Sequence, residues 1–220
     1  MNQANLKIEN PTPKLNVQDI SFNEFLNRLK EKMKLVYHER ASIDKLAIKR
    51  GMPPFVMREI MELNPLTVGI PSEYGGRGCK MEECIALLAT ASYESLALSL
   101  TFGINSALFL QPVAKYAQLE VKKPVFDRFI HHQNMGGLMI TEPNFGSDAF
   151  GMQTAYSEKN GKYHLKGTKH WAGLTGWADF WLLTAREKSE KGELKRDIDF
   201  FICDMNGPGQ QIVVEEFYEN

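Results

Sequence analysis

The stretch FIHHQNMGGLMITEPNFGSDAFG, residues Phe129–Gly151, contains the point at which the character of the chain changes. Before Gly136–Gly137 the sequence is helical in pattern, and after it comes the short apolar run LMI, which predicts a strand. A proline and the turn residues Gly146–Asp148 follow that strand. Because helices come first and strands afterwards, the sequence predicts an α+β fold with a domain boundary near residue 137.

The segment before this point begins with the helix SFNEFLNRLKEKMKLVYHER. Ser21 and Glu24 have the spacing of a capping box, in which the serine hydroxyl caps the first turn. Apolar residues then recur at helical spacing and predict one buried face, namely Phe22, Phe25, Leu26, Leu29, Met33 and Val36.

Three further helical segments are predicted up to residue 136. One begins at Pro54, where proline suits the first turn, and ends by Pro65, and the loop IPSEYGGRG follows it. Next, Met81–Ala117 predicts two helices joined near Ser95–Leu100 or Gly103. The segment KKPVFDRFIHHQ predicts a short helix, with a proline near its first turn.

The part after residue 137 predicts strands. Residues 153–158 and 162–166 flank Asn160-Gly161, a pair typical of a two-residue hairpin turn. Three more strands are predicted at DFWLLTAR, DIDFFICDM and QIVVEEF. A sheet that stopped there would leave an unpaired edge, so we expect the natural domain to continue.

Three regions are therefore expected. Residues 1–20 are polar and predict a flexible arm, residues 21–136 an N-terminal all-helical domain, and residues 137–220 an incomplete antiparallel β-barrel or sandwich domain, truncated within this chain.

Composition excludes several classes of protein. The chain has 220 residues and a formal net charge of −1, which argues against a nucleic-acid partner because phosphate binding needs an excess of Lys and Arg. The apolar run Leu96–Leu110 is too short and too interrupted for a membrane span and predicts a buried helix. Three cysteines without metal-ligand spacing and the absence of a signal-like N-terminus favour a reducing, cytoplasmic location.

Common catalytic and metal patterns are also missing. His131 and His132 are adjacent and point about 100° apart on a helix, so they do not share a metal, and we expect no metal site. The serine in FGSDAFG lacks the G-x-S-x-G pattern of a hydrolase nucleophile. No G-x-G-x-x-G sequence follows a predicted strand, which excludes a Rossmann-type site.

Two corners of the strand region contain candidate binding residues. Thr141 supplies a hydroxyl at a strand end, Gly146 and Ser147 supply backbone N–H groups, and Asp148 can cap the turn. In the second corner, KHWAGLTGWAD, Trp171 precedes two residues small enough for a flat ligand to approach the backbone. Core packing is the alternative for each tryptophan, and it applies also to the nearby tryptophans at 177 and 181.

Three colinear motifs over residues 20–220 resemble the acyl-CoA dehydrogenase family. IPSEYGGRG, Ile70–Gly78, is similar to the family's I-P-x-E-Y-G-G-x-G loop. ITEPNFGSD, Ile140–Asp148, is similar to its T-E-P-x-x-G-S-D signature. GTKHWAGLTGWAD, Gly167–Asp179, is similar to its G-x-K-x-W-I-T/S-N-G-x-x-A-D stretch.

The resemblance implies a helical domain, a β-barrel domain and a C-terminal helical bundle, of which the bundle is absent here. It implies FAD as the cofactor and oxidation of acyl-CoA to the 2,3-enoyl thioester, in which a carboxylate removes the α-proton and the β-hydride passes to flavin N5. Ser147 is also implied to contact the acyl-CoA substrate. The residues that the resemblance assigns to FAD are Leu138, Met139, Ile140, Thr141, Gly146, Ser147, Trp171, Ala172 and Gly173.

The resemblance also implies an acyl-CoA or other acyl-thioester substrate, an electron acceptor such as an electron-transfer flavoprotein, and a homo-oligomer for the full-length protein. The catalytic base of the family lies on the C-terminal bundle, so no residue of this chain is assigned that role. Three positions depart from the family pattern, with Lys166 for Asn, Ala172 for Ile and Gly173 for Thr or Ser. A flavin or acyl-thioester binding module without activity, an acyl-carrier-protein dehydrogenase, and an oxidase or monooxygenase relative are therefore alternatives.

Overall fold

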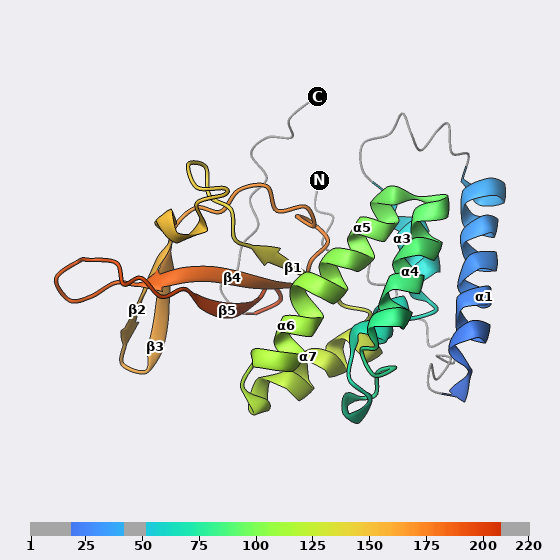
Figure 1. Cartoon of the computed structure of the whole chain (residues 1–220), viewed down its shortest axis with the longest axis horizontal. Coiled ribbons are helices and arrows are strands. Elements are labelled where there is room, and N and C mark those ends of the chain that lie inside the picture. The colour runs from blue at the N-terminus through green and yellow to red at the C-terminus, as the bar shows by residue number, and fades with distance from the viewer. Residues whose placement is uncertain (1–18, 42–51, 208–220) are drawn as a thin grey trace. The chain divides into compact units, whose positions relative to one another are not determined.

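A computed structural model of the chain describes residues 19–41 and 52–207 (Figure 1). The described residues form two compact units, one within Met1–Ser99 and one within Leu100–Asn220. The predicted boundary near residue 137 is a division by type of secondary structure, and it stays a prediction. Residues 1–18 of the predicted arm and the predicted strand QIVVEEF lie outside the described residues.

The first unit is built from α1 (Phe22–Lys34), α3 (Pro54–Met61) and α4 (Met81–Glu94). Ser21 caps α1 as predicted, because its hydroxyl accepts the backbone N–H of Glu24 at 3.2 Å. The predicted buried face of α1 faces the core of this unit, and the fully buried residues on it are Phe25, Leu29, Met33 and, in the π-helical turn η2 (Leu35–Arg40), Val36.

The loop IPSEYGGRG connects short 3-10 turns, η3 (Pro65–Gly69) and η4 (Ser72–Tyr74), with α4. Two backbone hydrogen bonds fold it back on itself, from Arg77 N–H to the Thr67 carbonyl and from Gly78 N–H to the Ile70 carbonyl, each at 2.9 Å. The predicted break near Ser95 is confirmed, since this residue ends α4 in an extended conformation.

Four helical segments lie between α4 and the sheet in the chain. They are α5 (Leu96–Gly103), the π-helical η5 (Ile104–Leu110), α6 (Gln111–Tyr116) and α7 (Leu119–His132). The expectation that Pro124 lies near the first turn of the last helix was wrong, because α7 begins five residues earlier and contains this proline in its interior. Gln118 precedes the first turn of α7 in an extended conformation. Pro124 has no backbone N–H, and the loss of this one hydrogen-bond donor does not end the helix.

The continuous stretch Leu96–Tyr116 is long and apolar enough to cross a membrane by length and composition, with a mean hydropathy of 1.4. Apolar core helices pass the same test. Several of its large side chains are buried, as predicted for a core helix, namely Leu98, Phe102, Phe109, Leu110 and Val113.

The sheet has the order β1-β4-β2-β3, and β5 pairs with β4. Its strands are β1 (Gly136–Met139), β2 (Ala155–Lys159), β3 (Lys162–Lys166), β4 (Phe180–Glu187) and β5 (Asp199–Asp204). The predicted hairpin is confirmed, with Asn160 and Gly161 both in the left-handed conformation at φ 54° and 70°.

Within the described residues, the expected sequence of helices followed by an unclosed sheet is confirmed, but the sheet is mixed rather than purely antiparallel. Strand β4 runs parallel to β1 and β2 and antiparallel to β5. The parallel pairs arise because long connections, rather than hairpins, return the chain to β4. Sequence periodicity reports only which face of a strand is buried, so it does not distinguish the two pairings.

The helices of the second unit pack on the sheet through three stacked rings. The rings of Phe109 and Phe129 have centroids 5.5 Å apart, and Phe180 lies 6.0 Å from the first and 6.2 Å from the second. The glycines at the start of β1 permit this packing, since a Cβ at Gly136 would lie 2.4 Å from the Phe109 ring. The buried Asn105 accepts the Gly136 N–H at 2.8 Å and fixes β1 against η5.

Candidate functional site

The first part of the candidate site is the end of β1. Leu138 and Met139 belong to the strand, which pairs with β4 from Gly136 to Met139. Ile140 is 36% exposed, and Thr141 is half-buried just beyond the strand. The strand therefore places these residues at the rim of the sheet, where their exposed atoms are open to a ligand.

The turn after Thr141 is closed by its own backbone. Glu142 and Phe145 exchange two backbone hydrogen bonds, at 3.1 and 3.2 Å. Beyond them Gly146 and Ser147 are exposed. The Asp148 carboxylate accepts the Gly151 N–H at 3.1 Å, so the predicted capping role of this residue is confirmed.

The second part of the site is the corner after β3. Trp171 has a φ of 59°, an unusual left-handed conformation for a bulky residue. Its ring is stacked on His170 at 4.7 Å, and the residue is 79% exposed. A Cβ added at Gly173 would meet only Ile104 Cδ1, at 3.6 Å, so there is open space at this glycine, two residues after Trp171.

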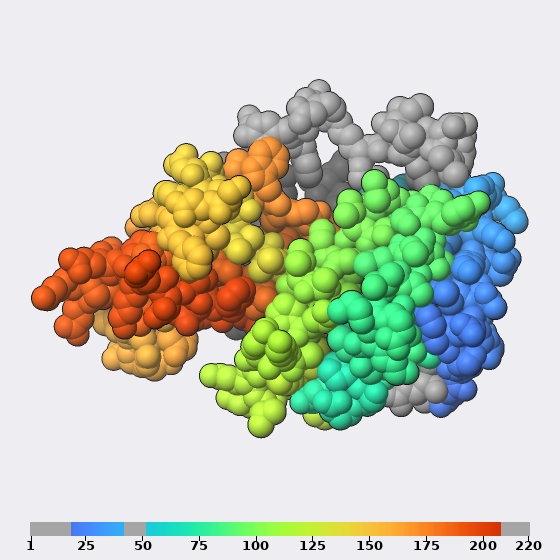
Figure 2. Space-filling view, in the orientation of Figure 1, coloured from blue at the N-terminus to red at the C-terminus, as the bar shows by residue number. Residues whose placement is uncertain are grey.

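A backbone hydrogen bond brings the two corners together, from the His170 N–H to the Thr141 carbonyl at 2.8 Å. Met139 and Ala172 also pack against one apolar cluster, whose buried members are Leu174, Ala178 and Trp181. Figure 2 shows that the yellow segment near residue 150 and the orange segment near residue 175 both reach the molecular surface in the second unit. Thr141 and Trp171 are thirty positions apart in the sequence. They are thus brought close to each other at one exposed corner.

The three tryptophans have different environments. Trp171 is 79% exposed, whereas Trp181 is 4% exposed and belongs to the apolar cluster. Trp177 is half-buried. Core packing is therefore the correct assignment for Trp181, and Trp171 is the tryptophan whose ring is available to a ligand.

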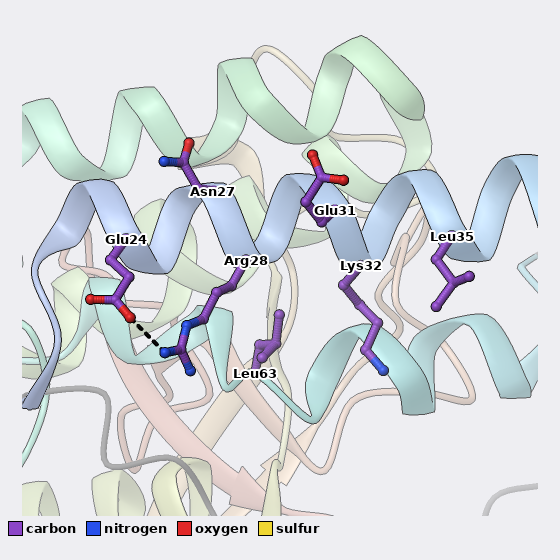
Figure 3. Close-up of a pocket in the computed structure, with 7 residues that line it drawn as sticks. All are labelled: Glu24, Asn27, Arg28, Glu31, Lys32, Leu35 and Leu63. Atoms are coloured by element: carbon purple, nitrogen blue, oxygen red, sulfur yellow. Dashed lines mark hydrogen bonds and ion pairs between the residues drawn. The ribbon is translucent and has the colours of Figure 1, made fainter.

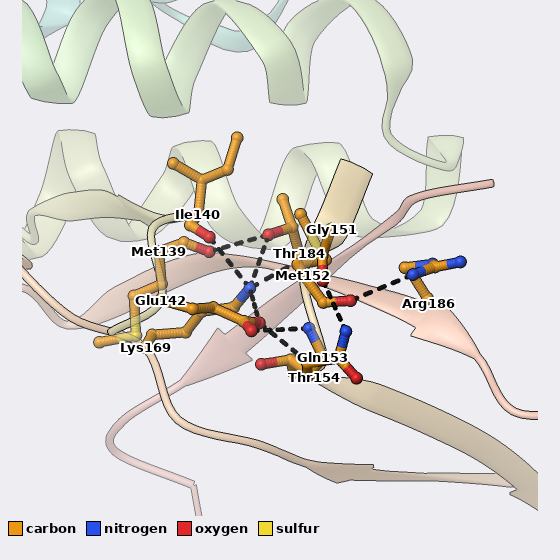
Figure 4. A network of polar contacts seen from close by, with 10 residues as sticks. All are labelled: Met139, Ile140, Glu142, Gly151, Met152, Gln153, Thr154, Lys169, Thr184 and Arg186. Atoms are coloured by element: carbon orange, nitrogen blue, oxygen red, sulfur yellow. Dashed lines mark hydrogen bonds and ion pairs between the residues drawn. The ribbon is translucent and has the colours of Figure 1, made fainter. Parts of the chain in front are cut away.

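A buried ion pair lies beneath these corners. Lys169 Nζ lies 3.0 Å from Glu142 Oε1, and both side chains are 5% exposed. The same ammonium donates to the Ile140 carbonyl and to the Thr184 hydroxyl, each at 3.1 Å, and Figure 4 shows it pointing into the group formed by these atoms. The carboxylate also accepts the backbone N–H groups of Gln153 at 2.6 Å and Thr154 at 2.9 Å.

This environment determines the ionisation of Glu142. Burial alone would raise its pKa, but the hydrogen bonds from the backbone N–H groups of Gln153 and Thr154 and from the Lys169 ammonium outweigh that effect. The pKa is held at about 2, below the ordinary value of 4.5. Glu142 is therefore a carboxylate at neutral pH and is unsuited to act as an acid or base there.

A hollow of about 680 Å³ lies beside the turn that contains Asp148. Arg186 and Arg196 line it with two cationic groups, together with Asp148, Asp197, Phe150 and Gly151. All three nitrogens of the Arg186 guanidinium donate to backbone carbonyls, which fixes the position of its charge.

A second hollow of about 720 Å³ lies in the first unit, along one face of α1. Figure 3 shows its wall, made of polar side chains of α1 and the apolar side chains of Leu35 and Leu63, with an ion pair between Glu24 and Arg28. It contains none of the predicted site residues. Its charged side chains are those of a solvated helix face, and we assign no ligand to it.

Sequence reasoning did not single out Glu142, Lys169 or Thr184 as members of one network. Glu142 and Lys169 lie inside the two quoted motifs, so each was visible as a charged residue beside an apolar run. Their pairing was not visible, because 27 positions separate them. The roles of the nine predicted residues toward a ligand stay predictions.

The chain matches two family profiles. The profile described as the N-terminal domain of acyl-CoA dehydrogenase matches residues 29–133, and that of the acyl-CoA dehydrogenase middle domain matches residues 137–219. Among curated proteins, an acyl-CoA dehydrogenase of Bacillus subtilis is 28% identical over 142 residues, which are 64% of this chain and 37% of that protein.

Solved structures of similar fold include butyryl-CoA dehydrogenase from Megasphaera elsdenii, with a TM-score of 0.70 and 24% identity over 92% of this chain and 51% of that one. Another is a glutaryl-CoA dehydrogenase from Mycobacterium smegmatis in complex with FADH2, with a TM-score of 0.71 and 18% identity over 86% of this chain and 46% of that one. The chain thus spans about half or less of the length of these relatives.

Proposed function

The chain belongs to the acyl-CoA dehydrogenase family, and from this premise we propose that it contributes the flavin-binding and thioester-binding corner of an FAD-dependent oxidoreductase that dehydrogenates an acyl thioester. The reaction would remove a proton from the α-carbon and a hydride from the β-carbon of the acyl group. Bound FAD would supply the hydride acceptor.

The observation that carries this proposal is the hydrogen bond from His170 to Thr141, which brings the exposed Trp171 to the end of β1. An exposed indole and, two residues later, a glycine with open space fit a flat, aromatic group such as the flavin ring. The residues present are therefore suited to this cofactor, and Thr141, Ala172 and Gly173 would hold it with Trp171.

The roles of the chain's own residues follow from their chemistry. Trp171 and the apolar rim of β1 would exclude water from one side of the ligand, which strengthens polar contacts there. The Thr141 hydroxyl can donate a hydrogen bond to the cofactor. The exposed turn at Gly146 and Ser147 allows a second ligand to approach backbone N–H groups, and Ser147 can bind the thioester substrate.

The hollow beside this turn supports a substrate with phosphate groups. Arg186 is fixed by three carbonyl acceptors, and Arg196 lies in the same wall. Both can attract the phosphates of coenzyme A or of a phosphopantetheine carrier, and Asp148 and Asp197 line the same hollow. Coenzyme A and a phosphopantetheine carrier protein share these phosphate groups. Both are therefore proposed sources of the thioester.

We assign none of the described residues as the catalytic base. Glu142 is the buried carboxylate nearest in sequence to Thr141, but its lowered pKa and its three hydrogen-bond donors make it a poor base. Transfer of electrons to an electron-transfer flavoprotein and homo-oligomeric assembly belong to this proposal as properties of the whole protein.

FAD titration of the 220-residue chain tests the proposal. We expect saturable binding with a change in flavin fluorescence, which Trp171→Ala weakens. The anaerobic addition of butyryl-CoA or of butyryl-pantetheine should then bleach the visible flavin band if the chain is active. Binding without bleaching would support the alternative of a binding module without activity, and a chain that takes up no FAD would contradict the proposed flavin site.

A further inference from the structure

We propose that Glu142 and Lys169 are a positioning pair, which holds Thr141 and the left-handed Trp171 in the arrangement that the ligand requires. This inference rests on the proposed function, since the ligand is the proposed flavin. Neither residue touches that ligand in the proposal. They act through the backbone of their neighbours, Thr141 on one side and Trp171 on the other.

Lys169 connects three segments through one ammonium group. It donates to the Ile140 carbonyl at 3.1 Å, just before Thr141, and to the Thr184 hydroxyl on β4 at 3.1 Å. Thr184 in turn donates to the Met139 carbonyl at 3.2 Å. With the Glu142 carboxylate at 3.0 Å, the ammonium is surrounded by acceptors from the turn, from β4 and from the end of β1 (Figure 4).

Glu142 connects the same turn with the start of β2. Its two oxygens accept the N–H groups of Gln153 and Thr154, at 2.6 and 2.9 Å, and the second oxygen is shared with Lys169. The residue directly follows Thr141. The backbone on both sides of Thr141 is therefore fixed by the pair, at Ile140 through Lys169 and at Glu142 through its own side chain.

Trp171 is the residue that most needs such support. A bulky side chain in the left-handed region is strained, and strain of this kind persists only when neighbouring residues fix the backbone. Lys169 is anchored two residues before it, and the His170 N–H is bonded to Thr141. After it, the Ala172 carbonyl accepts the N–H and the hydroxyl of Thr175, at 3.2 and 2.7 Å.

A buried ion pair such as Glu142–Lys169 adds little to the stability of the fold by itself. Desolvation of two charges cancels much of their attraction, and apolar residues of similar volume often serve a core equally well. The pair instead fixes the relative positions of the segments it joins. Each acceptor must lie at a defined position around the ammonium, and each donor at a defined position around the carboxylate. This is the property that a ligand corner assembled from distant segments requires.

The first experiment reads the position of Trp171 without any ligand. The chain has three tryptophans, so 5-fluorotryptophan labelling should give three ¹⁹F resonances, and Trp171→Phe identifies one of them. In Lys169→Met we expect the Trp171 resonance to shift or divide while the resonance of the core Trp181 stays in place. Lys166→Met, which alters an exposed lysine on β3, is the matched control and should move neither resonance.

The second experiment separates positioning from fold stability. In Lys169→Met we expect the Kd for FAD to rise by at least about tenfold. The double variant Lys169→Met/Glu142→Gln no longer buries an unpaired charge, so its urea midpoint should move back toward wild type. Its Kd for FAD should stay raised, since the bonds to Ile140 and Thr184 are still missing.

Two results would overturn the inference. One is an unmoved Trp171 resonance in Lys169→Met, and the other is recovery of FAD affinity together with stability in the double variant. If Lys169→Met does not fold, Thr184→Val decides the question, because it removes one acceptor of Lys169 and keeps the side-chain volume. If the wild-type chain binds no FAD, the proposed function fails, while the ¹⁹F comparison still decides whether the pair positions Trp171.

Discussion

Gly137 and Trp181 are partners across the parallel pair of β1 and β4, and the indole covers the glycine so closely that a Cβ at residue 137 would lie 2.5 Å from the ring. The strand that leads to Thr141 is therefore seated directly on the largest side chain of its apolar cluster. A side chain at this position would displace either the ring or the strand.

Gly137→Ala should accordingly lower the free energy of unfolding by about 1–3 kcal/mol, the usual cost of overpacking. Gly146→Ala is the matched control, because a Cβ at that residue meets nothing within 4 Å. Urea denaturation of the two variants beside wild type measures the difference. Equal midpoints for both would contradict the close packing of Gly137 on Trp181.

Truncation of the buried tryptophan should mainly lower stability, and truncation of the exposed tryptophan should mainly weaken FAD binding. Trp181→Ala removes a 4% exposed ring from the cluster and should cost about 3–5 kcal/mol of stability. Trp171→Ala should change stability by less than about 0.5 kcal/mol but raise the Kd for FAD about tenfold, since stacking on an aromatic ring contributes about 1–3 kcal/mol. Thermal unfolding checks the two stability changes, and FAD titration checks the change in Kd. A large loss of stability in Trp171→Ala would assign that ring to the fold instead.

Acid should weaken the second unit through Glu142. Its pKa of about 2 lies below the ordinary 4.5, so the folded state favours the carboxylate more than the unfolded chain does. The resulting stability is present above about pH 5 and is lost as the pH falls from 4.5 toward 2, amounting to at most about 3 kcal/mol.

This contribution is isolated by comparing wild type with Glu142→Gln. The difference in free energy of unfolding between the two should shrink as the pH falls from 5 to 2, because the protonated carboxyl and the amide then resemble each other in charge. Glu158→Gln, at an exposed position on β2, should show no such convergence. Parallel pH curves for wild type and Glu142→Gln would contradict a strongly lowered pKa.

Gly173 offers a test of where the ligand lies. A Cβ at this exposed residue would meet only Ile104 Cδ1 at an ordinary contact distance, so Gly173→Leu should fold with a stability within about 0.5 kcal/mol of wild type. If the flavin occupies the open space at Gly173, the same change should abolish most FAD binding. Thr168→Leu, at an exposed position in the same segment, should leave FAD binding intact.

Most elements of the fold were predictable because their signals are local. The Ser21 cap, the helix start at Pro54 and the Asn160-Gly161 turn each depend on neighbouring residues, and all three are confirmed. The parallel pairing of β1 with β4 was not predictable, because it depends on which distant strand forms backbone hydrogen bonds with the edge of β1. The start of α7 was misplaced since tertiary packing tolerates Pro124 inside a helix.

The candidate site divides in a similar way. Motif residues such as Thr141, Trp171 and Gly173 could be named from the sequence, because their residue types suit the edge of a flat ligand. Their arrangement could not, since the hydrogen bond from His170 to Thr141 joins positions 29 residues apart. Sequence alone also left core packing as an alternative for each of the three tryptophans, whereas burial separates Trp181 from Trp171.

By itself, the order of residues determined that helices precede strands at Gly136–Gly137 and that glycine-rich turns follow a strand end, since backbone conformation responds to local side chains. Only the tertiary structure decided that Glu142 and Lys169 pair beneath those turns and that Trp171 is left facing outward. Burial and charge pairing are properties of segments brought together in space, and no local pattern reports them.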